Sequence, residues 1–309
     1  MGRARWAAVG VLGVAVLALP LGLPQFYVLL STEILIMGLF AVAFNLLLGY
    51  GGMVSFGHAA FYGIGAYTCG LLLKKAGAPF AVAFLAAPVV AGAVAVVFGF
   101  LCIRLTRIYF SMLTLAFSQI VWAVAFKWYS LTGGDNGLIG IPVPAALAGP
   151  RALYLFTAVI AVSVAGVLWR VVNAPFGRTL LALRENAERA EFVGLHVRRV
   201  QLAAFVISGA VSGLAGALFA LFTRGAFPDY AFWTKSAEVL IMTLLGGPYV
   251  FLGPALGAAI LIVLNSVVTS FTEYWPVVLG AILLLLIYVF PGGLTRLVRA
   301  RAAAPAAEP

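Results

Sequence analysis

Apolar residues run along this chain in long blocks, separated by short polar connections. A helix needs about 20 apolar residues to cross the hydrocarbon core of a bilayer. By that length we predict ten membrane crossings, at residues 6–24, 31–49, 52–73, 79–102, 108–129, 152–172, 202–223, 234–247, 254–272 and 275–292. Glycine interrupts the third, and the eighth ends early at GGPYVFLGP. The pattern therefore predicts an all-α, polytopic membrane protein in which some helices are broken or re-entrant.

The first apolar block resembles a signal peptide, because Arg3 and Arg5 precede it. Its apolar run, residues 6–23, is longer than the roughly 7–15 residues of a signal-peptide core. No small-x-small cleavage site follows it. We therefore predict a first membrane helix.

Composition excludes a water-soluble protein. The chain is 64% hydrophobic and 9% charged, with a mean hydropathy of +1.13, whereas soluble proteins carry roughly 25% charged residues. The net charge of +10 would suggest a nucleic-acid partner in a soluble protein. In a membrane protein, Lys and Arg collect in cytoplasmic loops instead, so we expect contact with membrane lipid and none with nucleic acid.

The positions of the basic residues set the expected orientation. With ten crossings and a cytoplasmic N-terminus, 13 of the 19 basic residues lie inside. The six predicted outside are Lys74, Lys75, Lys127, Arg151, Arg224 and Lys235. Both termini are then cytoplasmic. Residues 1–295 form one transmembrane domain, and residues 296–309 form a cytoplasmic tail predicted to be disordered.

The most unusual stretch is GYGGMVSFGHAAFYGIGAY at residues 49–67. Glycine can break a helix, and broken helices occur at membrane depth only where they are buried in protein or line a wet cavity. We expect this break near a central translocation pathway. The candidate pathway residues are Asn45, Gly51, Gly52, Ser55, Gly57 and His58.

Two interpretations of the polar members of this set stay open. Asn45, Ser55 and His58 either line the pathway or hydrogen-bond neighbouring helices and fix their packing. Ser208, Gly209, Ser212, Gly213 and Gly216 form small-x-x-x-small patterns that indicate a close helix-packing face. Residues 246–254 mark a second broken region.

The longest internal connection, residues 173–201, is amphipathic. Its small or apolar positions recur at helical spacing, at Leu180, Leu183, Ala187, Ala190, Val193 and Val197. Arg184–Glu188 and Glu185–Arg189 are spaced as i,i+4 ion pairs. Because Gly194 interrupts the pattern, we predict two short helices joined by a turn. The segment either lies on the membrane or docks to a protein, and its mixed glutamates favour a protein partner.

Five motifs occur in an order that resembles the branched-chain amino acid permeases of ABC importers, notably the M-type subunit of the Liv system. These are the stretch at 49–67, TGGDNGL at 132–138, LRENAERAEFVGL at 183–195, AAFVISGAVSGLAGAL at 203–218 and LLGGPYVFLGPALGA at 244–258. Residues 188–194 also resemble the Glu-Ala-Ala-x-x-x-Gly loop of such permeases, with Arg189 in place of the first alanine. The resemblance covers roughly residues 30–292.

The resemblance implies a permease subunit of the bacterial plasma (inner) membrane that imports leucine, isoleucine, valine or related hydrophobic amino acids. The implied partners are a homologous second permease, two cytoplasmic ATPases and an external binding protein. The loop that docks to the ATPase would contain Arg184, Glu185, Glu188, Ala190 and Gly194. Importers of urea and short-chain amides belong to the same family and remain an alternative.

The chain itself has no G-x-x-x-x-G-K-[ST] phosphate loop, so ATP would bind to another chain. We expect no catalytic residue, cofactor or metal site, and we interpret Cys69 and Cys102 as packing residues. A serine protease built on Ser55 and His58 lacks the G-x-S-x-G elbow. A secondary transporter usually needs a mid-membrane acid, and the carboxylates, Glu33 and Glu238 among them, are predicted near the helix ends.

Overall fold

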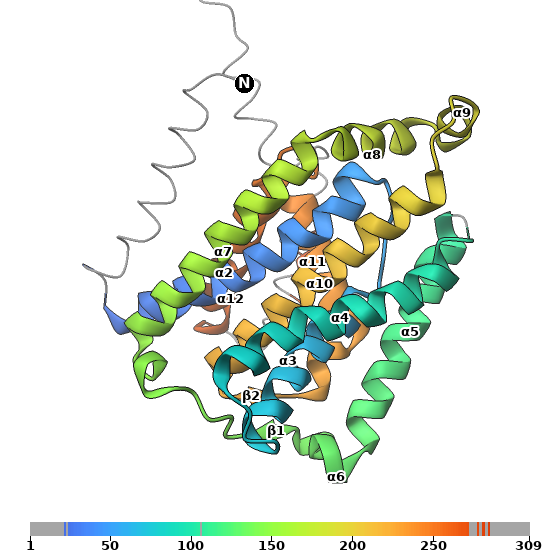
Figure 1. Ribbon diagram of the computed structural model, residues 1–309. Coiled ribbons are helices and arrows are strands. Elements are labelled where there is room, and N and C mark those ends of the chain that lie inside the picture. The colour runs from blue at the N-terminus through green and yellow to red at the C-terminus, as the bar shows by residue number, and fades with distance from the viewer. Residues whose placement is uncertain are drawn as a thin grey trace, which may run out of the picture.

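The computed structural model describes residues 24–105 and 107–271, with Gly22 and positions 277, 280, 281 and 284. The predicted crossings at 6–24 and 275–292 lie almost entirely outside these residues, and the tail at 296–309 lies wholly outside them. Within the described part, helices run along the long axis of one bundle (Figure 1).

Five of the described helices are long and apolar enough to span a membrane. They are α2 with its terminal π turn (Gln25–Tyr50), α4 (Phe80–Cys102), α5 (Arg107–Lys127), α7 (Pro150–Asn173) and α10 (Val197–Thr223). Three further helices of the bundle are shorter, namely α3 (His58–Lys74), α11 (Trp233–Gly246) and α12 (Gly253–Thr269). The third and eighth predicted crossings, which sequence marked as irregular, correspond to the short helices α3 and α11.

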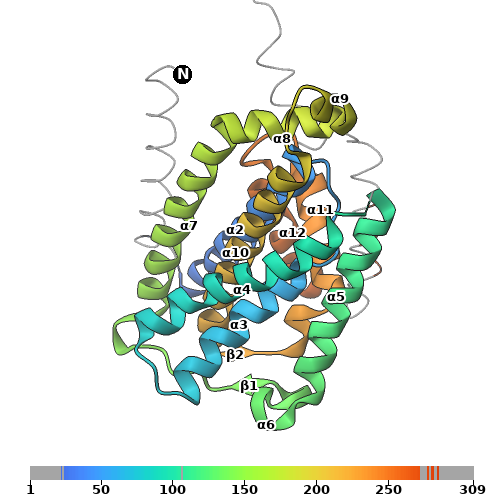
Figure 2. The ribbon, with the colours of Figure 1, turned by 45° about the vertical axis from the view of Figure 1, so that its right-hand side comes forward.

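Helix α10 lies at the centre of the bundle, against α2, α3 and α4 (Figure 2). Its small residues allow this position. A β-carbon added at Gly216 would collide with the main-chain carbonyl of Tyr62, and one added at Gly213 would collide with Ala91. Ser208 and Ser212 are fully buried on the same helix. The predicted small-residue packing face is confirmed.

The outer helices carry large apolar side chains on exposed faces. Val89 of α4 is 69% exposed, Ile108 of α5 is 71% exposed, and Val167 of α7 is 60% exposed. Water would penalise such a surface by roughly 25 cal/mol for every Å² of apolar area. The bilayer removes that penalty, because lipid tails are as apolar as these side chains.

One end of the bundle carries a small β pair, and we call it the β1–β2 end. Strand β1 (Leu138–Ile139) pairs antiparallel with β2 (Gly225–Ala226). The connection from α5 to α7 also holds α6 (Tyr129–Thr132), η3 (Gly134–Asn136) and η4 (Ala145–Leu147). Gly133, Gly134 and Gly137 have positive φ angles there, which explains the glycines of TGGDNGL. This pair is a small departure from the predicted all-α fold.

The opposite end carries two short helices, and we call it the α8–α9 end (Figure 1). They are α8 (Pro175–Glu185) and α9 (Ala187–Phe192), which together connect α7 to α10. A further 3-10 turn, η5 (Pro228–Ala231), leads from β2 back into the bundle and on to α11.

Candidate functional site

The first helix break lies where the glycine-rich stretch predicts it. Helix α2 ends at Asn45, a π turn covers Leu46–Tyr50, and α3 begins only at His58. Gly52 has a φ of +67°, which a residue with a β-carbon rarely adopts. The predicted crossing at 52–73 is therefore wrong in its first turns, because residues 51–57 are not helical.

Helix α5 holds the non-helical segment in place. The Thr114 hydroxyl accepts a hydrogen bond from the main-chain N–H of Phe56 at 3.1 Å, and the Ser111 hydroxyl donates to the Val54 carbonyl at 2.6 Å. A β-carbon at Gly57 would lie 2.8 Å from the Thr114 carbonyl oxygen. Gly57 thus permits close approach to α5 and is not needed for an unusual backbone angle.

His58 is fully buried and both ring nitrogens have partners. Nε2 lies 2.8 Å from the Ser208 hydroxyl, which itself donates to the Ala43 carbonyl at 2.6 Å. Ser208 has only one proton to give, so Nε2 must be the donor. Nδ1 then accepts from the Ser55 hydroxyl at 3.0 Å. This arrangement satisfies a neutral ring and favours the packing interpretation of His58 and Ser55.

Asn45 differs from its neighbours. Its side chain is buried, yet neither amide atom has a hydrogen-bond partner within the described part of the chain. A buried polar group left without a partner costs about 1–3 kcal/mol. Its amide oxygen lies against Gly49, where an added β-carbon would collide with it. Asn45 therefore sits at the break itself.

The second broken region separates two helices at the same end of the bundle. Helix α11 ends at Gly246 and α12 begins at Gly253, as GGPYVFLGP predicts. The two breaks meet, because an added β-carbon at Gly49 would also collide with the Pro248 carbonyl oxygen. Glycine at position 49 is what allows this close approach.

Arg184 of α8 connects both breaks to the α8–α9 end. Its guanidinium group donates a hydrogen bond to the Gly49 carbonyl. The same group lies over the ring of Tyr249, 4.7 Å from the ring centroid. The Cγ atom of Arg184 would lie 2.9 Å from a β-carbon added at Gly52. Arg184 was predicted to belong to the docking loop, whereas in the structure its side chain points inward to the two helix breaks.

The predicted pair of short helices is present, but the joint lies elsewhere. The turn falls at Asn186, whose side chain accepts a hydrogen bond from the N–H of Arg189 at 2.9 Å and caps α9. Gly194, with φ of +86°, instead ends the segment before α10. The expected pairs Arg184–Glu188 and Glu185–Arg189 are wrong, because they span the turn at Asn186 and no longer have helical spacing.

The remaining docking candidates divide by exposure. Glu185, Glu188 and Gly194 are exposed, while Ala190 is buried. Val193, predicted to face inward, is 77% exposed, and its neighbour Phe192 is 84% exposed. Phe192 was not among the predicted docking residues, because the one signal in the sequence was an aromatic residue at the end of a polar helix.

Lys235 and Glu238 lie deeper than predicted. Just before α11, the Ala231 carbonyl accepts a hydrogen bond from Ser118, halfway along α5, at 2.8 Å. Ala231 also packs on Gly63 of α3. At a rise of 1.5 Å per residue, that position is about 16 Å from the end of α3 at Lys74. The predicted external positions of Lys235 and Glu238 are therefore wrong, since α11 begins near the middle of the bundle.

These features define a class of protein. Apolar helices with exposed apolar faces, two buried helix breaks and a polar helical pair at one end are typical of a multi-pass membrane transporter, in which irregular backbone occurs at membrane depth beside a pathway. Within the described residues, no group of three or more His, Cys, Asp or Glu side chains could hold a metal ion.

Comparison with known proteins identifies the family. The sequence profile of "Branched-chain amino acid transport system / permease component" matches residues 26–287. The chain therefore belongs to this permease family. It is 30% identical to the high-affinity branched-chain amino acid transport system permease protein LivM of Escherichia coli (strain K12), over 87% of this chain and 70% of that protein.

More distant relatives vary in the cargo their names state. The probable branched-chain amino acid transport permease protein LivM of Methanocaldococcus jannaschii is 26% identical over 62% of this chain and 61% of its own. The autoinducer 2 import system permease protein LsrC of Salmonella typhimurium is 30% identical over 54% of this chain and 49% of its own. No solved structure gives a significant match.

Family membership bears on the competing functions. The chain is a LivM-like, multi-pass permease of the ABC transporter class, and its homologues are transport subunits. Ser55 and His58 are hydrogen-bonded to each other, but both are fully buried among the described residues, where a protease substrate would have no access. Because Glu238 lies within the bundle, the absence of a mid-membrane acid no longer argues against a secondary transporter. The evidence against that function is membership of the permease family.

Proposed function

We propose that this chain is the transmembrane permease subunit of an ATP-driven importer that carries leucine, isoleucine, valine or related hydrophobic amino acids into the cytoplasm. The family match over residues 26–287 and the LivM relative support the cargo. The contact of Arg184 with both helix breaks is the observation that supports the mechanism. Urea or short-chain amides remain the alternative cargo.

The α8–α9 end is the proposed docking site for an ATPase subunit. The exposed carboxylates Glu185 and Glu188 and the exposed side chains Phe192 and Val193 would contact it. An apolar side chain surrounded by charges is a common form of interface anchor. Buried Ala190 and the left-handed Gly194 would hold α9 against the bundle. This end would then be cytoplasmic, in agreement with the basic residues predicted on that side.

Arg184 is proposed to carry movement from the docking site to the pathway. An ATPase that shifts α8 would pull on Gly49 in the first break and on Tyr249 in the second. Asn45 lies beside Gly49, so a shift of the π turn would change its surroundings. Gly51, Gly52, Ser55, Gly57 and His58 would form the structural frame of this gate, while Asn45 would face the pathway when the gate opens.

The proposed assembly contains this chain, a homologous second permease, two cytoplasmic ATPases and an external binding protein, in the bacterial plasma membrane. Residues 1–295 would form one permease domain, with residues 173–201 as its coupling loop, 296–309 as a cytoplasmic tail, and both termini cytoplasmic. ATP hydrolysis would take place in the ATPase chains, because this chain has no phosphate loop.

Purification of the tagged chain from its native membrane in mild detergent tests this proposal. We expect mass spectrometry to find a second permease and an ATPase in the purified complex. The variants Glu188→Lys and Gly194→Trp should lose the ATPase and keep the second permease. Isolation of the wild-type chain alone, even after crosslinking, would contradict the proposed function.

A further inference from the structure

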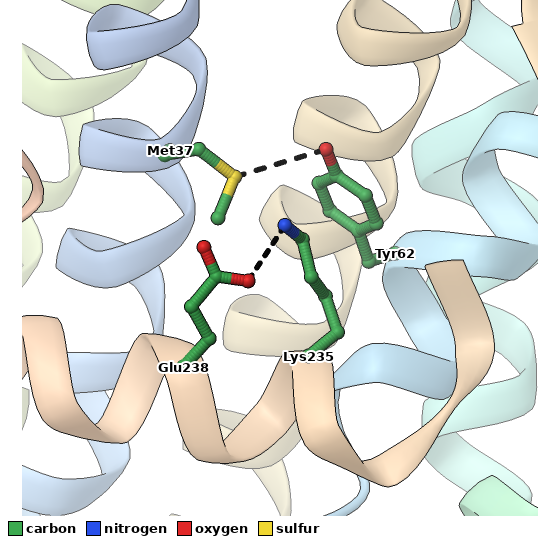
Figure 3. Close-up of polar contacts among 4 residues, drawn as sticks. All are labelled: Met37, Tyr62, Lys235 and Glu238. Carbon is green, nitrogen blue, oxygen red and sulfur yellow. Dashed lines mark hydrogen bonds and ion pairs between the residues drawn. The ribbon is translucent and has the colours of Figure 1, made fainter. Parts of the chain in front are cut away.

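Four residues from three helices converge in the interior of the bundle. Lys235 and Glu238 of α11 form an ion pair, with 2.7 Å between Nζ and Oε2. Figure 3 shows this pair together with Tyr62 of α3 and Met37 of α2, all pointing into the space between the helices. The Tyr62 hydroxyl is buried, and its acceptor is the Met37 thioether sulfur at 3.9 Å, a weak partner.

A fifth residue, Glu33 of α2, adds a second carboxylate. It is partly buried and lies one helical turn before Met37 on the same face of α2, near enough for the charges of Lys235 and Glu238 to influence it. We call Glu33, Met37, Tyr62, Lys235 and Glu238 the mid-bundle cluster. Its charged members are two carboxylates and one ammonium group, and Glu33 forms no ion pair within the described residues. If all three are ionised, the cluster has a surplus negative charge.

Such a cluster is expensive within a membrane. Ionisable side chains at this depth are rare, and they usually face a pathway or a partner charge. Lys235 and Glu238 would largely neutralise each other, whereas Glu33 lacks a cation of its own. Both residues of the ion pair retain some exposure, 20% for the Lys235 side chain and 33% for that of Glu238. The two charged side chains of the pair are thus partly accessible, whereas Tyr62 and Met37 lie fully buried behind them.

A second observation points to a ligand. Tyr67, on α3 between Tyr62 and the β1–β2 end, is buried, and its hydroxyl has no hydrogen-bond partner within the described residues. It lies within electrostatic range of Tyr230, which in turn interacts with Glu33 and hydrogen-bonds Thr223 at 3.1 Å. Tyr230 also packs against Tyr62 of the cluster, with 6.0 Å between the ring centroids.

We propose that the mid-bundle cluster is a transient binding site for the charged main-chain groups of the transported amino acid. Glu33 and Glu238 would receive the α-ammonium group, and Lys235 the α-carboxylate. Tyr62 would donate a hydrogen bond, and Met37 would contact the apolar side chain. This inference rests on the proposed function and narrows it, because uncharged urea or amides would leave the charges unmatched.

The geometry also explains why binding at this site would be weak. Lys235 is already paired with Glu238, so a substrate exchanges one ion pair for another and the net gain is small. A pathway needs sites that a substrate can leave. The competing explanation is that Lys235–Glu238 is an ordinary i,i+3 helix pair with a structural role alone.

Transport by the complete complex in proteoliposomes tests the site. The variants are Lys235→Met and Glu33→Gln, with the exposed Lys127→Met as the matched control. We expect leucine uptake to fall about tenfold or more in both cluster variants, the usual effect of losing a charged hydrogen bond. ATP hydrolysis stimulated by the binding protein should persist in them, and Lys127→Met should transport normally.

The charge swap Lys235→Glu with Glu238→Lys separates recognition from structure. It keeps the helix pair, so thermal stability should return to that of the wild type, but it reverses the charges offered to the substrate and uptake should stay low. Normal uptake in Lys235→Met and Glu33→Gln, or uptake restored by the swap, would overturn the proposal. A wild-type complex that takes up no amino acid would contradict the proposed function itself.

Discussion

The guanidinium group of Arg184 in α8 donates a hydrogen bond to the main-chain carbonyl of Gly49, in the π turn that ends α2. This contact joins a helix near the surface to a break within the bundle, across a long separation in sequence. The same guanidinium lies over Tyr249 in the second break. One side chain therefore contacts both helix breaks.

Replacing Arg184 should uncouple ATP hydrolysis from transport. In Arg184→Ala the Gly49 carbonyl and the Tyr249 ring lose their shared partner, and we expect uptake to fall about tenfold, in line with the loss of a charged hydrogen bond. ATPase binding should remain. Arg178→Ala is the matched control, since Arg178 is exposed on the same helix. Equal uptake in the two variants would show that the contact carries no coupling.

Phe192 should matter for assembly and not for folding. It is 84% exposed at the end of α9, so Phe192→Asp removes an apolar contact without opening a cavity. We expect the variant to insert and pair normally but to lose the ATPase in detergent pull-downs. Phe271 is equally exposed, at 84%, and lies just after the C-terminus of α12, far along that helix from the second break. Phe271→Asp is the control and should retain the ATPase.

His58 should contribute to stability more than to transport. His58→Ala removes the partners of Ser55 and Ser208 and leaves a cavity among Phe44, Phe61 and Phe205. Losses of this kind cost about 2–5 kcal/mol. We expect a lower midpoint of thermal unfolding, with uptake per folded molecule close to normal. Lost uptake at unchanged thermal stability would restore the pathway interpretation.

Two glycine-to-alanine substitutions, one in α10 and one in α7, should differ sharply in their effect on thermal stability. Gly216→Ala places a methyl group against the main-chain carbonyl of Tyr62, so α3 and α10 must separate. Gly166→Ala in α7 meets nothing within 4 Å and should be neutral or slightly stabilising. Thermal unfolding in detergent measures both. A similar midpoint for the two variants would argue against close packing of α3 on α10.

Much of this architecture could be predicted from sequence, because its signals are local. Glycine clusters at 49–52 and 246–253 indicate helix breaks on steric grounds, and small-x-x-x-small spacing indicates the packed face of α10. The apolar spacing of residues 180–197 indicates short amphipathic helices in the connection between α7 and α10, although not the position of their joint. These features need only neighbouring residues to be recognised.

The sequence predictions were wrong where a helix cap or a contact between distant segments determines the structure. Asn186 ends α8 because its side chain caps the next helix, an effect that the i,i+4 charge pattern around it concealed. The depth of Lys235 and Glu238 depends on η5 re-entering the bundle between α3 and α5. The one sequence signal was the short length of α11, which cannot span a bilayer from a start at the surface.

Uptake of radiolabelled leucine by the purified complex in proteoliposomes tests the central claim most directly. The proposed complex would contain this chain, a partner permease and the ATPases, with the binding protein added outside. We expect accumulation that requires ATP at the ATPase face and stops with a non-hydrolysable analogue. Accumulation that proceeds without ATP, or that follows an imposed proton gradient instead, would contradict the central claim.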